Sequence, residues 1–253
     1  MRLQHATWQE VEAYLQRSTG IILPIGSTEQ HGPNGPVGTD ALCPEAIAWA
    51  LGERHGVLVG PTQAIGMAQH HLAFPGSLTL RPSTLIAVLR DTIASLAQHG
   101  FTHVFFLNGH GGNVATVNAA FAEVFAGRSL QRQPVGELDL RLFNWFAGRR
   151  GRELADSLYG EAEGSHATAS EVSLAWHAAP RTVREVAMSP RLAPDGSARC
   201  DAHTFRQRFP DGRMGSDPSL ASAEHGARFL EAGVEDAWEA YQTFIADSQG
   251  ASE

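Results

Sequence analysis

The chain reads FTHVFFLNGHGGNVATVNAAFAEVF at residues 101–125. Residues 101–107 are an apolar run, which is typical of a buried strand. A turn with three glycines follows at residues 108–113, and residues 114–125 have the character of a helix. A strand, a tight turn and a helix in this order form part of a βαβ unit, so the segment predicts an α/β fold with a mainly parallel sheet.

The same alternation of strands and helices continues on both sides of that unit. Residues 21–25 are a short apolar run, residues 41–56 look helical, and residues 57–59 suit a second strand. Residues 135–140 are a candidate for a further strand. Helices that connect parallel strands cover both faces of the sheet, so we expect a single-domain three-layer sandwich.

The organisation of the chain is expected to be simple. The length suits one domain over residues 1–253, with a core over about residues 1–180. Residues 196–222 are polar and without clear periodicity, so we expect a long loop or an interface arm there. Residues 223–246 are expected to form a C-terminal helix.

Two helices have recognisable ends in the sequence. Thr7, with Glu10 three residues later, is a capping box that predicts a helix start. Ser83 or Thr84 is expected to cap an amphipathic helix that Gly100 ends.

The composition argues against several classes of protein. The formal charge of −8 disfavours a nucleic-acid partner, and two cysteines without a CxxC pair disfavour a disulfide framework or a thiolate zinc site. No apolar run approaches the ~18 residues of a membrane span. The first twenty residues lack the apolar segment of a signal peptide. We expect a cytoplasmic protein that binds a small molecule, with no nucleic-acid or membrane partner.

The first group of candidate site residues is Glu29, His31 and Asp40. They lie in a loop at residues 26–40 that is rich in glycine and proline and follows a predicted strand. In an extended segment, residues two apart point to the same side, and the loop can bring Asp40 back toward them. Carboxylate and imidazole groups bind Zn, Mn or Fe without sulfur, although a single Glu or His in a loop is usually only solvated.

The second candidate is His110, within the glycine-rich turn at residues 108–113. This turn also follows a predicted strand, and the carboxyl ends of parallel strands share one edge of the sheet, where ligands bind. We therefore expect His110 to lie near the first group. A phosphate site at the helix N-terminus is an open alternative, but the order G-x-G-x-x-G of a dinucleotide site is missing.

A third pair is His166 and Glu171. If Ala169 starts a helix, Glu171 lies in its first turn and His166 in the preceding loop. The two side chains could then reach the same site, but their spacing does not require it. His71 is expected in a loop or a pocket wall.

Several of these motifs together resemble the creatininase (creatinine amidohydrolase) family. The resemblance runs from about residue 20 to residue 175 and rests on the following segments: PIGSTEQHGP from Pro24, Gly38-Thr-Asp40, Phe74-Pro-Gly, Asn108-Gly-His-Gly-Gly-Asn113, and residues 166–173. It implies a creatininase-like α/β domain that assembles as a homo-oligomer, often a hexamer arranged as a trimer of dimers.

The resemblance also implies a binuclear site for two divalent metal ions, either Zn, Mn or Fe. Asp40 would bridge the ions, and His166 would transfer protons. The implied metal ligands are Glu29, His31, Asp40, His110 and Glu171, and Glu171 is also expected in catalysis. The expected substrate contacts are His71, Gly111, Gly112 and Asn113.

The chain departs from the creatinine-hydrolysing members at two positions. They carry a glutamate ligand where this chain has Gly112 and a substrate-covering tryptophan where it has Ala162. The family's usual His-Ala-Gly-Glu is also changed, because Thr168 and Ala169 follow His166 and its alanine. Creatinine itself is therefore not the expected substrate.

The function expected from the sequence is hydrolysis of a small cyclic or N-formyl amide by a metal-activated water. The turn at residues 109–113 could offer backbone N–H groups to the developing oxyanion. The open alternatives are a hydrolase of a cyclic carbonyl compound or lactone, and a non-catalytic metabolite-binding protein with a residual metal site.

Overall fold

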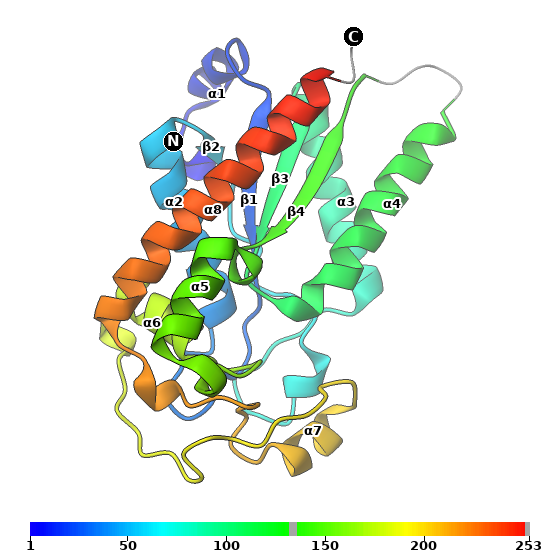
Figure 1. The fold of residues 1–253 in the computed structure, drawn as a ribbon. Helices are drawn as coiled ribbons and strands as arrows, with labels where there is room; N and C mark the ends of the chain where they lie inside the picture. Colours follow the sequence, from blue (N-terminus) through cyan, green and yellow to red (C-terminus); the bar gives the residue numbers. More distant parts are fainter. Residues whose placement is uncertain (132–135, 251–253) are drawn as a thin grey trace.

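The computed structural model describes residues 1–131 and 136–250. Within these residues, four parallel strands form one sheet in the order β2-β1-β3-β4 (Figure 1). The strands are β1 (Gly20–Ile25), β2 (Leu58–Val59), β3 (His103–Asn108) and β4 (Asp139–Asn144). The expected further strand at residues 135–140 was placed too early, since β4 begins at Asp139; Val135 lies outside the described residues.

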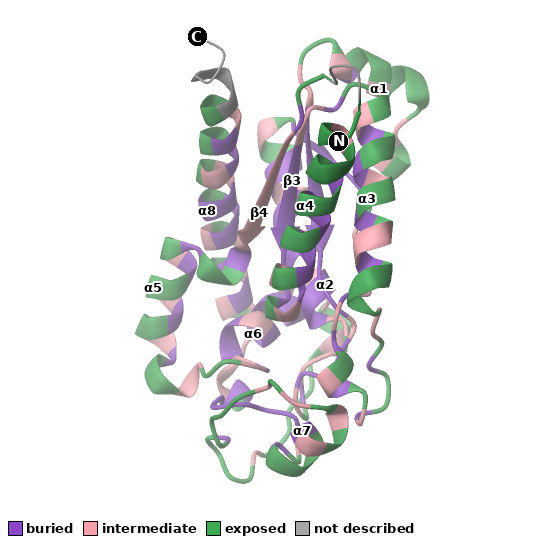
Figure 2. Ribbon diagram, turned by 90° about the vertical axis from the view of Figure 1, so that its right-hand side faces the viewer, coloured by how far each residue is buried: buried purple, intermediate pink, exposed green. Residues whose placement is uncertain are grey.

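Helices cover both faces of the sheet, which confirms the predicted three-layer α/β fold (Figures 1 and 2). Successive strand residues point to opposite faces. Ile22 and Phe105 face a core with α2, α6 and α8, while Ile21 and Phe106 face a core with α1, α3 and α4. The helices are α1 (Trp8–Leu15), α2 (Thr39–His55), α3 (Pro82–Gln98), α4 (Val114–Ser129), α5 (Arg149–Leu158), α6 (Ala169–Ala178), α7 (Ala202–Arg208) and α8 (Ala223–Gly250).

The helix ends match the sequence in one case and differ in another. The capping box of Thr7 and Glu10 is present at the start of α1. The expected cap of α3 at Ser83 or Thr84 is wrong, because the helix begins at Pro82, with Arg81 as its N-cap residue. Proline suits the first helical position, where its fixed φ fits and its missing N–H has no partner to lose.

The segment at residues 196–222 contains α7 and packs against the rest of the chain. Phe205 and Phe209 of this segment form a small apolar core with Phe74 and Met214. Met214 also pairs with His166 in an antiparallel bridge. This segment therefore supports a loop that carries a candidate site residue.

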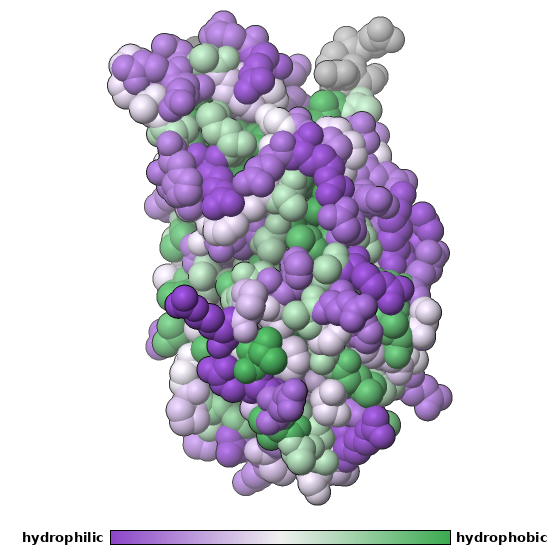
Figure 3. Space-filling view, turned by 90° about the vertical axis from the view of Figure 1, so that its left-hand side faces the viewer, coloured by the Kyte–Doolittle hydropathy of each residue, from purple (hydrophilic) through white to green (hydrophobic). Residues whose placement is uncertain are grey.

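The surface shown in Figure 3 mixes hydrophilic and hydrophobic side chains, with a group of hydrophobic ones in its lower half. Among the described residues, no helix has the length and apolar character that crossing a membrane requires.

Candidate metal centre

The carboxyl ends of two adjacent strands carry the polar residues of the centre. β1 ends at Ile25, which pairs with Asn108 at the end of β3, so the two strands end side by side. Glu29 and Asp40 follow β1 in the chain, and His110 follows β3. All three side chains are buried. The two clusters therefore meet at one edge of the sheet, as the order of elements predicts.

Asp40 lies between two imidazoles. Its Oδ1 atom is 3.0 Å from Nε2 of His31, and its Oδ2 atom is 3.0 Å from Nδ1 of His110. Nε2 of His31 also lies 3.9 Å from Oε2 of Glu171, a residue of α6. A carboxylate whose two oxygens face two different imidazoles is placed where it could contact two cations.

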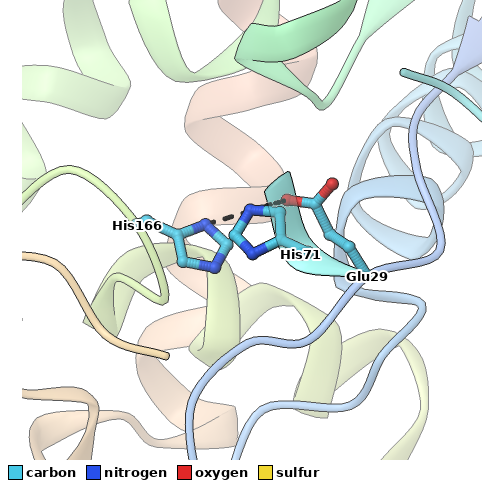
Figure 4. A group of neighbouring side chains, drawn as sticks. All are labelled: Glu29, His71 and His166. Carbon is cyan, nitrogen blue, oxygen red and sulfur yellow. Dashed lines mark ion pairs between the residues drawn. The ribbon is translucent and has the colours of Figure 1, made fainter. Parts of the chain in front are cut away.

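Glu29 is a second carboxylate with several imidazole neighbours. Its Oε1 atom lies 3.1 Å from Nε2 of His71 and 3.8 Å from Nδ1 of His166, and its Oε2 atom lies 3.3 Å from Nε2 of His110. Figure 4 shows Glu29, His71 and His166 reaching toward one another from three separate segments. The rings of His71 and His166 stack, with 4.5 Å between their centroids. His71 therefore belongs to this cluster.

A strained turn brings His166 and Glu171 to the same place. Ala167, next to His166, has a φ of 52°, a value that residues with a Cβ atom rarely adopt. Thr168 then caps α6: its Oγ1 accepts the N–H of Glu171 at 3.2 Å, and its own N–H donates to Oε1 of Glu171 at 2.6 Å. The capping box occupies Oε1 and leaves Oε2 of Glu171 facing His31.

Backbone carbonyls fix the orientation of two imidazoles. Nδ1 of His31 lies 3.0 Å from the carbonyl oxygen of Glu29, and Nε2 of His110 lies 3.0 Å from that of Met67. A neutral imidazole that donates one N–H to a carbonyl keeps a lone pair on its other nitrogen. His31 therefore presents Nε2, and His110 presents Nδ1, toward Asp40. Histidines that bind metals are commonly oriented in this way.

Gln30 orients the other two imidazoles. Its Oε1 accepts the N–H of Gly32 at 2.9 Å, so its amide nitrogen faces Nδ1 of His71 and the carbonyl oxygen of Gly212, each at 2.9 Å. Nε2 of His166 lies 2.9 Å from the backbone oxygen of Gln30. Because the amide nitrogen donates to Nδ1 of His71, that ring carries its proton on Nε2. Nε2 of His166 also lies 2.8 Å from the amide nitrogen of Gln30, so Gln30 holds this nitrogen and leaves Nδ1 directed at Glu29.

The residues of the centre fit a divalent cation. Among the described residues, Glu29 Oε1, Glu29 Oε2 and Asp40 Oδ2 are buried without a well-formed hydrogen bond, and imidazole nitrogens lie 3.0–3.3 Å from them. Buried charges need compensation, which a cation would supply. The donor atoms of each of three overlapping groups lie within 4.8 Å of one another: Glu29–His31–Asp40, His31–His166–Glu171 and Glu29–His71–His166. Carboxylate and imidazole donors suit Zn, Mn and Fe.

Two histidines have raised pKa values in the metal-free chain. Burial alone would lower the pKa of His31, but the negative charges of Asp40, Glu171 and Glu29 outweigh burial and raise it to about 10. The same balance, with Glu29 and Asp40 as the main charges, raises the pKa of His110 to about 9. Both rings are therefore positively charged imidazolium ions at neutral pH, and a bound divalent cation would replace the second proton of each.

The pKa values of His71, His166 and Glu171 shift mainly because these side chains are buried. Burial, reinforced by neighbouring histidines, lowers the pKa of His71 to about 3 and that of His166 well below its usual value. Both are neutral at physiological pH. Burial also raises the pKa of Glu171 to about 7.

A cavity of about 360 Å³ opens beside the centre. Asp40, His110, His166 and Glu171 line it, together with Gly111 of the glycine-rich turn. This volume is near the lower end of the ~300–1,000 Å³ range of small-molecule sites. Three of the five expected ligands therefore share one cavity with His166, the expected proton carrier.

The expected substrate contacts are only partly on this cavity. Gly111 lines it, whereas His71 lies within the cluster. At Gly112 a side chain would collide with Nε2 of His110, so the glycine leaves room for the ring. The buried amide of Asn113 bonds two backbone groups of neighbouring loops. Gly112 and Asn113 shape the turn, and we do not retain them as substrate contacts.

Comparisons with known proteins agree with this chemistry. The family model "Creatininase: Creatinine amidohydrolase" matches residues 4–241. The mycofactocin precursor peptide peptidase of Mycobacterium ulcerans (strain Agy99) is 28% identical over 85% of this chain and 82% of its own length. The creatinine amidohydrolase of Pseudomonas putida is 34% identical over 41% of this chain and 42% of its own length. The 3-dehydro-scyllo-inosose hydrolase of Thermotoga maritima is 28% identical over 68% of this chain and 54% of its own length.

Solved structures of similar fold are creatininases. One described as "Creatininase Mn" superposes with a TM-score of 0.77 at 27% identity, covering 96% of this chain and 97% of that one. A variant of the "Zn-Zn type" gives a TM-score of 0.78 at 26% identity, with the same coverage. The metals in these descriptions are of the kind that imidazole and carboxylate donors bind.

Proposed function

The chain belongs to the creatininase family of metal-dependent amidohydrolases, and on that premise we propose that it hydrolyses a small amide of the cyclic or N-formyl class at two divalent ions. The observation that carries the proposal is the position of Asp40, whose two oxygens face His31 and His110 separately. The proposed ligands of the two ions are Glu29, His31, Asp40, His110 and Glu171. Cations bound there would act as Lewis acids that activate a water and polarise the amide carbonyl.

His166 is the proposed proton carrier. Its Nδ1 atom lies 3.8 Å from Glu29 in the centre, while Nε2 lies 2.9 Å from the backbone oxygen of Gln30. We assign the proton of the resting imidazole to Nε2, which leaves a lone pair on Nδ1. Its lowered pKa keeps the imidazole neutral before reaction, so it can accept a proton from the attacking water. The same nitrogen then gives that proton to the leaving amide nitrogen, which would otherwise depart as a very poor anion.

Within the part of the chain that the structure describes, two of the five N–H groups at residues 109–113 donate to no other group, those of Gly111 and Gly112, and of these two only Gly111 lies on the cavity. The N–H groups of Gly109, His110 and Asn113 already donate to other groups of the protein. Gly111 lines the cavity, and we assign its N–H to the developing oxyanion. This narrows the five-residue segment expected from the sequence to one position.

A second candidate substrate class is a cyclic carbonyl compound or lactone. The similarity to the 3-dehydro-scyllo-inosose hydrolase, over 68% of this chain, favours it. The same residues would serve, because both reactions need a nucleophilic water and a polarised carbonyl.

Assembly as a homo-oligomer also remains part of the proposal.

Elemental analysis of the purified protein, combined with a hydrolysis screen, tests the proposal. The screen contains cyclic amides, N-formyl compounds, lactones, short peptides and creatinine. We expect turnover of a cyclic or N-formyl amide that His110→Ala abolishes and that the exposed control His99→Ala retains. Binding of these compounds without turnover of any would support a non-catalytic metabolite-binding protein instead.

A further inference from the structure

Helix α5 carries three arginines that differ in their partners. Arg149 bonds Glu153, one turn further along, at 3.0 Å. Arg150 lies 2.8–3.1 Å from three carboxylates of α8. Among the described residues, Arg152 has neither an ion pair nor a hydrogen bond to another residue. The guanidinium of Arg152 is therefore available to an outside anion.

Arg152 lines the same cavity as His110 and His166. An exposed arginine is usually a solvated surface residue without a further role. Arg152 differs from such residues because it lines the cavity beside the proposed metal centre. A molecule that fills the cavity would contact both the centre and this arginine.

The other charged groups of the cavity wall limit which anion suits it. Glu163 lines the cavity, but its carboxylate bonds the N–H and the hydroxyl of Ser170, and burial raises its pKa. Asp156 lies one turn after Arg152 and also lines the cavity without an ion pair. A nearby carboxylate disfavours a doubly charged group such as a phosphate, so a singly charged carboxylate fits best.

Part of this wall is apolar. Trp145, Phe146 and Phe229 contribute to it. Apolar walls exclude water and strengthen a hydrogen-bonded ion pair between guanidinium and carboxylate. They also suit the carbon skeleton between two polar ends of a small molecule.

From this arrangement we infer that the substrate carries a carboxylate, which Arg152 binds while the scissile amide lies at the metal centre. The inference rests on the proposed amide hydrolysis and adds the class of substrate. Arg152 acts as a specificity-determining residue, since its contact is remote from the reacting bond. It should therefore act mainly through KM for substrates that carry the charge.

Matched substrate pairs test the inference on the metal-loaded protein. Each pair has the same scissile bond and differs only in a remote carboxylate or carboxamide, such as N-formyl amino acids and their C-terminal amides. We expect the acids to be preferred in kcat/KM by about 10- to 100-fold, as for a charged hydrogen-bonded pair. Arg152→Gln should remove that preference through KM and leave the neutral partner nearly unchanged. Arg149→Gln on the same helix is the matched control and should retain it.

A binding measurement separates this inference from the proposed function. N-methanesulfonylglycine, which lacks a hydrolysable formyl group, is titrated calorimetrically into wild-type protein and Arg152→Gln. Equal turnover of acids and amides overturns the inference and leaves amide hydrolysis standing. Arg152-dependent binding of the acid without turnover of any amide supports the anion site and overturns the hydrolysis. If the acids are not preferred and binding does not depend on Arg152, the inference is wrong.

Discussion

Oδ2 of Asp40 lies 3.0 Å from Nδ1 of His110, although the two residues follow different strands of the sheet. The other oxygen of the same carboxylate faces another imidazole. Asp40 is nearly fully buried, and its neighbours hold its pKa well below the usual range despite its burial. It stays ionised in the fold, in the position that a bridging ligand would need.

Replacing Asp40 by asparagine keeps the size of the side chain and removes its charge. We expect Asp40→Asn to lose bound metal and at least ~100-fold in activity, because even outer-shell partners of a metal contribute 10- to 100-fold. Asp91→Asn, at an exposed position that pairs with Arg90, is the control and should behave as wild type. Full metal content in Asp40→Asn would remove this residue from the ligand set.

The variant His166→Gln tests proton transfer separately from metal binding. We expect kcat to fall by about 10²–10⁴-fold, the usual contribution of general acid–base catalysis, while the metal content is unchanged. The exposed His203, changed to Gln, serves as control. Loss of metal together with activity would show instead that His166 is a ligand.

The chain has two capping boxes, and only one of them lies at the centre. Thr168→Val and Thr7→Val should each destabilise the protein by about 1 kcal/mol, measured by denaturant unfolding. Only Thr168→Val should also weaken metal binding, because Thr168 orients Glu171. An equal metal affinity in both variants would argue that the orientation of Glu171 does not matter for the ions.

Metal binding should depend strongly on pH. His31 and His110 must lose protons to bind, and their pKa values in the metal-free chain are about 10 and about 9. Between pH 7 and 9 two protons leave, so the apparent affinity should rise up to about 100-fold per pH unit. Below about pH 7 Glu171 releases a third proton, and the slope should be steeper there. Competition with a chelator of known affinity between pH 6 and 8 measures this slope; a flat profile would contradict it.

The same raised pKa values predict that the free energy of unfolding of the metal-free protein depends on pH. A group whose pKa is higher in the folded than in the unfolded state stabilises the fold fully below its unfolded pKa, near 6.5 for histidine. That contribution should disappear as the pH rises through about 9 to 10, the values of His110 and His31.

The sequence allowed the sheet edge to be predicted better than the details of the cavity. Glu29, Asp40 and His110 could be brought together in advance, because the carboxyl ends of parallel strands share an edge. The joint position of His166 and Glu171 depended on the turn at Ala167, whose positive φ no residue pattern announced. The spacing of Thr168 and Glu171 was a readable capping-box signal for the start of α6.

Other features depend on packing between segments that are distant in the chain. The side chain of Gln30 donates to the carbonyl oxygen of Gly212, and the ring of His71 packs against Phe205 of α7. The orientation of both side chains therefore requires residues 196–222 to fold over the centre. Helix α5, with Arg152, has a polar sequence whose cavity face only the packed structure reveals. Propensity and periodicity carry no information about such contacts.

The most direct test of the metal centre measures metal content and amide hydrolysis on the same purified sample, before chelation, after chelation and after reconstitution. We predict about two divalent ions per chain, loss of activity with the ions, and recovery when Zn, Mn or Fe is restored. Full activity in protein that holds no metal would contradict the account.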